Sequence, residues 1–155
     1  MTPKPDRRQM KSTARLYAVQ ALFQMEAGDT TLEEVRDQFI EHRFGAETEE
    51  GTFVSGNVNL FETLIFEAVN QQAKIDQLTD RALVAKWPID RIDSTLRALF
   101  RAAGAELVVG KTPPKVVISE YVDVAKAFFP EGREAGFVNA VLDYMAHEAQ
   151  PEAFT

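Results

Sequence analysis

Residues 61–78, FETLIFEAVNQQAKIDQL, carry apolar side chains at the spacing of an amphipathic helix. The apolar positions follow the i, i+3, i+4 pattern over about five turns, which places them on one side of a helix. They are Phe61, Leu64, Ile65, Ala68, Val69, Ile75 and Leu78. Trp87 and Pro88 are the first residues to interrupt this pattern, because proline cannot continue a helix. The sequence therefore predicts one long helix here, the longest element of the chain.

Two shorter helices are expected before this segment. Apolar residues within residues 12–27 favour a first helix, and Gly28 follows at a position typical of a helix end. Thr30 and Thr31 each precede a glutamate by three residues, which is the spacing of a capping box at a helix start. A second helix is therefore expected next, followed by a loop over residues 44–56, which are rich in glycine and acidic residues.

Three more helices are expected in the second half of the chain. Apolar stripes mark residues 92–107, 118–125 and 138–145, and the pair Pro113 and Pro114 separates the first stripe from the second. No stretch alternates polar and apolar residues convincingly enough to predict a strand. The sequence thus predicts an all-α fold, a single compact helical domain of about six to seven helices.

The composition excludes several classes of protein. The chain has 155 residues, of which 45% are hydrophobic, and this is enough to bury one core. It has no cysteine, so it can form neither disulfides nor a thiolate zinc site. No apolar run reaches the roughly 18 residues that span a bilayer, and the N-terminus lacks the apolar middle of a secretory signal. We therefore expect a soluble, cytoplasmic protein.

Charge is distributed unevenly along the chain, whose net charge is -7. The first 15 residues contain Lys4, Arg7, Arg8, Lys11 and Arg15. Against Asp6 these cations give a balance of +4, so residues 16–155 carry -7 minus 4, which is -11. Two interpretations remain open at this point: a solvated tail with incidental charge, or a short basic arm that contacts phosphates.

Motifs for catalysis or cofactor binding are weak. Residues 104–112, GAELVVGKT, are similar to a phosphate-binding P-loop, but the first glycine is displaced by one position, and Pro113 and Pro114 follow where a helix should begin. His42 and His147 lack a second metal ligand at helical spacing, and no serine lies in a nucleophile turn. We expect no enzyme activity, no catalytic residue, no metal and no cofactor.

Aromatic residues gather around the junction of the last two expected helices. Phe128 and Phe129 end one helix beside Pro130, and Phe137 begins the next after a short loop. Spacing alone favours a hydrophobic plug that joins the two helices. The alternative is a stacking surface, because unpaired RNA bases stack on exposed aromatic rings.

Four segments together resemble the NusB family of bacterial transcription antitermination factors. They are ARLYAVQALFQ (14–24), RIDSTLRALFRAAGAEL (91–107), PPKVVISEYVDVAKAFF (113–129) and FVNAVLD (137–143). The resemblance implies a fold of two three-helix bundles and a role in ribosomal RNA transcription. It also implies binding to single-stranded boxA RNA, heterodimer formation with NusE, a small-subunit ribosomal protein, and membership of the RNA polymerase antitermination complex.

The resemblance also implies which residues act. The RNA-binding set is Arg7, Arg8, Lys11, Arg15, Lys115, Phe128 and Phe137, with the cations contacting phosphates and the rings stacking bases. Asp90 stands where relatives carry an acidic residue that faces NusE. The chain departs from the family pattern at Ser119, where asparagine is usual, at Ala140, where glycine is usual, and at Ala105, where a larger side chain is frequent.

These considerations predict three regions: a flexible basic arm over residues 1–11, a NusB-like helical domain over residues 12–149 and a flexible tail over residues 150–155. A second hypothesis is a helical interaction module that homodimerises or docks a partner without significant RNA binding. A third is an enzyme, since related helical domains occur fused to RNA methyltransferases, but no catalytic domain is recognisable in these 155 residues.

Overall fold

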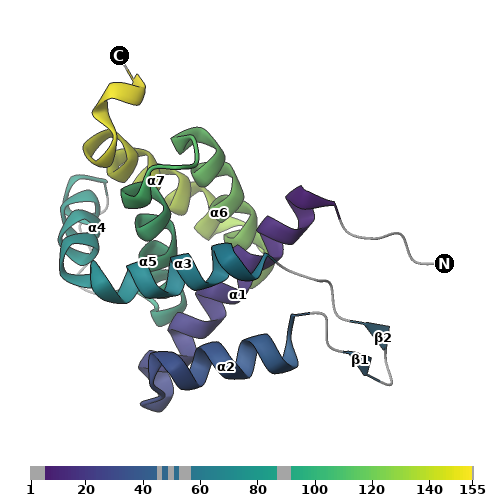
Figure 1. The fold of residues 1–155 in the computed structure, drawn as a ribbon. Helices are drawn as coiled ribbons and strands as arrows, with labels where there is room; N and C mark the ends of the chain where they lie inside the picture. The colour runs from purple at the N-terminus through teal and green to yellow at the C-terminus, as the bar shows by residue number, and fades with distance from the viewer. Residues whose placement is uncertain (1–5, 45–46, 49–50, 53–56, 87–91, 155) are drawn as a thin grey trace.

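A computed structural model describes residues 6–44, 47–48, 51–52, 57–86 and 92–154 of the chain. Its helices are α1 (Arg7–Gly28), α2 (Leu32–His42), α3 (Val58–Asn70), α4 (Gln72–Lys86), α5 (Ser94–Val109), α6 (Pro114–Phe128), α7 (Arg133–Ala149) and a 3-10 helix, η1 (Pro151–Phe154). Two short antiparallel strands, β1 (Glu47–Thr48) and β2 (Gly51–Thr52), lie within the segment expected to be a loop. The prediction of an all-α fold is confirmed (Figure 1).

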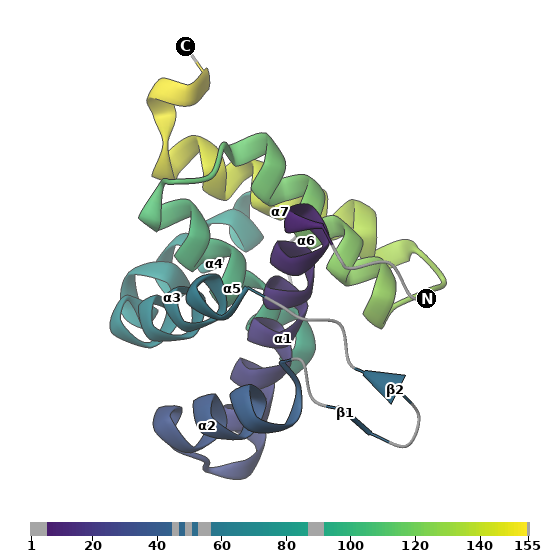
Figure 2. The same ribbon diagram turned by 45° about the vertical axis from the view of Figure 1, so that its right-hand side comes forward.

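The helices form two groups that meet along α5. Helices α1, α2 and α3 pack on one another, and helices α4, α6 and α7 pack around α5. Both α1 and α3 also pack on α5, and α1 reaches α6, as the turned view in Figure 2 shows. The second group therefore has four helices, one more than the resemblance implied, because the long helix predicted in the middle of the chain is divided in two.

The division occurs at Gln71, where the backbone leaves the helical region at φ -107° and ψ 17°. Residues 70–74, NQQAK, include no large apolar side chain, so no apolar packing by these residues stabilises a continuous helix there. The apolar face of α3 packs on α1 and α5, whereas α4 packs on α5 and α7. The prediction of one continuous helix was wrong because the apolar spacing resumes after the break on a helix with a new direction.

Helix α1 begins at Arg7, five residues before the start expected from the sequence. Asp6 caps it: its carboxylate accepts a hydrogen bond from the Gln9 backbone N–H at 2.7 Å, and the Gln9 side chain accepts one from the Asp6 N–H at 3.0 Å. This reciprocal capping box satisfies two backbone donors at the start of the helix. The first turns of this helix are polar, so apolar spacing did not predict where it begins.

Helix α5 is the central element. Most of its residues between Leu96 and Leu107 are buried. Gly104 permits a close approach of α4, since a Cβ atom added there would lie 2.5 Å from Ile75 Cγ2. At the end of the chain, within the expected tail, the Phe154 ring of η1 stacks on His147 with centroids 3.7 Å apart. No helix in the described ranges is both long and apolar enough to cross a membrane.

Candidate nucleic-acid interface

A groove of about 560 Å³ lies between the N-terminal half of α1 and the start of α6. Five exposed cations line it, and we call it the cationic groove: Arg7, Arg8, Lys11, Lys111 and Lys115. The structure thus brings three predicted residues of α1 next to the predicted Lys115, which is more than 100 positions later in the sequence. It also adds Lys111, which the sequence analysis did not select.

Local structure explains where these cations point. Arg7, Arg8 and Lys11 occupy the first turns of α1, and Arg7 and Lys11 are four residues apart on one side of that helix. On the opposite wall, α6 begins with Pro114 at its first position, which suits a helix start because proline has no backbone N–H to leave unpaired. Lys115 follows in the first turn, exposed to solvent.

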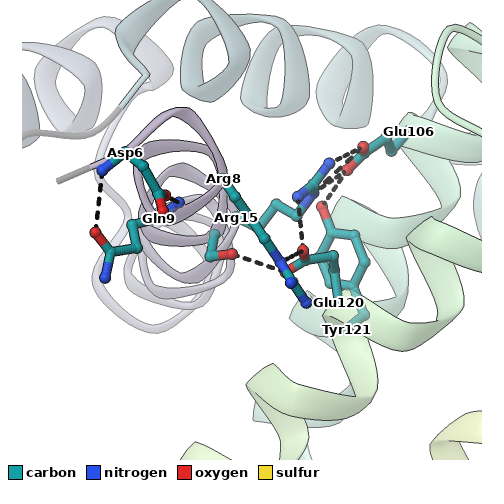
Figure 3. A network of polar contacts seen from close by, with 8 residues as sticks. Asp6, Arg8, Gln9, Arg15, Glu106, Glu120 and Tyr121 are labelled. Atoms are coloured by element: carbon teal, nitrogen blue, oxygen red, sulfur yellow. Dashed lines mark hydrogen bonds and ion pairs between the residues drawn. The ribbon is translucent and has the colours of Figure 1, made fainter.

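Arg15 lies in a buried polar network beneath the groove, with only 3% of its surface exposed (Figure 3). Its guanidinium donates two hydrogen bonds to Glu106, from Nε at 2.9 Å and from Nη2 at 2.8 Å. The predicted phosphate contact by Arg15 therefore needs correction. The guanidinium pairs with two carboxylates of the protein itself, Glu106 on α5 and Glu120 on α6. Arg15 therefore joins α1 to these two helices instead of extending into solvent.

Glu120 on α6 completes the network and reaches the cationic groove. Its carboxylate accepts a hydrogen bond from the Ser12 hydroxyl at 2.9 Å and lies 3.6 Å from Arg15 Nη1. It also lies 4.0 Å from Nε of Arg8, whose side chain is 83% exposed. Glu120 is firmly held in the structure, whereas Arg8 remains a surface residue that can contact other anions.

Burial and the neighbouring Glu106 shift the pKa of two groups in the network. Desolvation, reinforced by the nearby charge of Glu106, raises the pKa of Tyr121 well above its ordinary value. Tyr121 is therefore a neutral donor, and its hydroxyl donates to Glu106 at 3.1 Å. Burial alone would lower the pKa of Arg15, but the hydrogen bonds and charge of Glu106 outweigh it, so that the pKa lies above its ordinary value. The arginine stays charged.

A second groove, of about 450 Å³, follows the C-terminal half of α1. We call it the apolar groove; its lining includes Gln20, Phe23, Gln24, Phe39, Arg43 and Phe128. Phe23 is 40% exposed, and the Arg43 guanidinium lies over the Phe39 ring, 5.5 Å from its centroid. Phe128 is half-buried and thus presents part of its ring to this groove.

The other predicted residues lie elsewhere. Phe137 is half-buried and meets Phe100 edge to face, with centroids 6.0 Å apart, and it lines neither described groove. Phe129 is also half-buried and packs against the core. Ser119, one of the departures from the family pattern, is exposed in the cationic groove. Asp90 lies outside the described residues. The structure therefore brings the exposed cations together in one groove, whereas Phe137 is not part of the lining of either groove.

Comparison with known proteins identifies relatives over nearly the whole chain. The sequence model of the NusB family matches residues 12–147. The transcription antitermination protein NusB of Maricaulis maris is 44% identical, with 99% of this chain and 96% of the relative covered. That of Agrobacterium fabrum is 41% identical, with coverages of 92% and 87%. The solved structure described as T. maritima NusB has a TM-score of 0.73 at 28% identity, covering 98% of this chain and 99% of that one.

Proposed function

Because this chain belongs to the NusB family, we propose that it is an RNA-binding antitermination factor that binds boxA RNA of nascent ribosomal transcripts together with NusE. Its relatives are named transcription antitermination proteins. In this proposal the protein acts without catalysis in the cytoplasm, as part of the RNA polymerase antitermination complex. Asp90 remains a proposed contact for NusE.

The cationic groove is the observation that supports this proposal most strongly. Five exposed cations line one groove of a protein whose net charge is -7. Lysine and arginine side chains that line a groove neutralise phosphates, and RNA binding of this kind weakens as salt is added. The acidic remainder of the molecule repels RNA, so the exposed cations of this groove favour binding there.

The apolar groove supplies the second part of the proposed surface. In this proposal, bases of the bound strand stack on the exposed part of Phe128, and Phe23 offers a second ring in the same groove. Aromatic rings of this kind stack on bases with little regard to sequence. We omit the buried Arg15 from the proposed RNA contacts and keep Phe137 as a lesser one, since its half-buried ring packs against Phe100.

A titration tests the proposal through two lysines of the cationic groove, Lys11 on α1 and Lys115 on α6. We expect the double variant Lys11→Gln/Lys115→Gln to bind labelled boxA RNA about 10- to 100-fold more weakly at low salt than the wild type. The slope of log K against log salt should become shallower by about 1.4, since each phosphate contact to a single strand contributes about 0.7. Fluorescence anisotropy at several salt concentrations, with and without NusE, measures both quantities.

The control for this titration is Lys74→Gln, which removes an exposed cation from α4, outside the cationic groove. It should leave both affinity and slope unchanged. Equal affinity and slope for wild type and double variant, or no enhancement by NusE, would contradict the proposal and favour an interaction module that does not depend on RNA.

Phe128→Ala tests the contribution of base stacking. Loss of one stacked base costs about 1 to 3 kcal/mol, so we expect the affinity for boxA RNA to fall by about 5- to 150-fold while the salt slope stays the same. The matched comparison is Phe137→Ala, which should lower thermal stability because the ring packs on Phe100, with a smaller effect on RNA affinity in the folded protein. If the two variants show the opposite order in RNA affinity, the assignment of Phe128 is incorrect.

A further inference from the structure

Glu120 introduces a negative charge at the base of the cationic groove. Among the described residues that line this groove, it is the one carboxylate. Its side chain is only 11% exposed, and the Ser12 hydroxyl and Arg15 hold it in place from α1. A carboxylate fixed in this way cannot turn away when an anion enters the groove.

The network around Glu120 leaves this charge only partly compensated. One guanidinium, that of Arg15, is shared by two carboxylates, Glu106 and Glu120, and the Tyr121 hydroxyl contributes no charge. The nearest further cation is Arg8, at the outer limit of an ion pair and mostly exposed. The base of the groove therefore holds a fixed carboxylate, whereas Arg7, Arg8, Lys11, Lys111 and Lys115 give its exposed edges a positive charge.

We infer that Glu120 determines which phosphates the groove accepts, by repelling compact polyphosphates while tolerating an extended phosphodiester strand. Coulomb repulsion grows with the charge placed near the carboxylate. A triphosphate concentrates several negative charges within the groove, close to Glu120. A nucleic-acid strand carries one charge per nucleotide and can follow the exposed cations. The groove would thus resist occupation by nucleoside triphosphates; the part concerning RNA rests on the proposed function.

Inorganic tripolyphosphate is the probe that tests this selectivity. We expect Glu120→Gln, which removes the charge but keeps an acceptor for Ser12, to raise the affinity for tripolyphosphate by about tenfold or more, and that for boxA RNA by about threefold or less. Calorimetry measures the first and anisotropy the second. Asp123→Asn is the matched control: it removes a charge from the same helix outside both grooves and should change neither affinity by as much as twofold.

Several outcomes would overturn the inference. They are a lower or unchanged tripolyphosphate affinity in Glu120→Gln, an equal gain for RNA and tripolyphosphate, or an equal gain in Asp123→Asn. Thermal unfolding verifies that each variant folds, and Glu120→Met is a second neutral variant of similar size. Independently of any variant, tripolyphosphate at matched phosphate concentration should not displace RNA from the wild type. If the wild type binds no RNA, the proposed function fails, but the tripolyphosphate measurements still test Glu120.

Discussion

Arg15→Met should lower the free energy of unfolding by about 3 to 5 kcal/mol at neutral pH, because it leaves two buried carboxylates without their counter-ion. The wild-type guanidinium satisfies Glu106 with two short hydrogen bonds and also offsets Glu120. Methionine can do neither. Urea unfolding at neutral pH measures this loss.

Arg81→Met is the matched control for this prediction. Arg81 pairs with Glu148 in nearly the same two-bond geometry, with an Nη2 to Oε2 distance of 2.8 Å, but its side chain is 54% exposed. An exposed pair contributes at most about 1 kcal/mol, so this variant should remain close to the wild type. The double variant Arg15→Met/Glu106→Leu should recover much of the loss. Equal losses for Arg15→Met and Arg81→Met would refute the importance of burial.

Phe61→Ala should also cost about 3 to 5 kcal/mol, the usual range for removing a fully buried ring. Phe61 on α3 meets Phe39 of α2 and the following Phe44, with centroid distances of 5.6 and 4.9 Å. Since α2 packs chiefly on α1 and α3, loss of this ring should release α2 first. Hydrogen exchange should therefore quicken in α2 before the rest, and urea unfolding measures the total loss.

Phe23→Ala controls for the loss of an aromatic ring as such. Its ring is 40% exposed in the apolar groove, so we expect a change of less than about 1 kcal/mol and normal exchange in α2. If α2 keeps its protection in Phe61→Ala, the aromatic cluster does not hold that helix, and another contact must do so.

Apolar spacing predicted most helices because each buries one face, but it could not predict a change of direction. The residues on either side of Gln71 keep helical spacing, yet α3 and α4 pack against different neighbours. Only the arrangement of the other helices reveals this. The start of α1 at Arg7, in contrast, could have been predicted from the sequence, since Asp6 and Gln9 have the spacing of a capping box.

The charge of the candidate site could be predicted from the sequence, but which of its side chains are buried could not. The cluster of cations before residue 16 identified one wall of the cationic groove, and the resemblance added Lys115. Arg15 was assigned to the same surface because the sequence does not show that Glu106 and Glu120, about 90 and 105 positions later, take up its guanidinium. Phe23 was overlooked for a related reason: it belongs to the apolar face of α1, and the sequence does not show that its ring stays 40% exposed there.

A single unbroken helix, α1, contributes to both grooves, with Lys11 in one and Phe23 in the other. Twelve residues of helix fix their separation along the axis at about 18 Å, and also their relative direction. Lys11 and Phe23 point in directions about 120° apart around the helix axis, and one residue inserted between Arg15 and Gln20 would rotate everything beyond it by about 100° and turn Phe23 away from its present groove. Substitutions along this segment should therefore be tolerated better than insertions or deletions, because the length of the helix fixes the spacing of the two grooves.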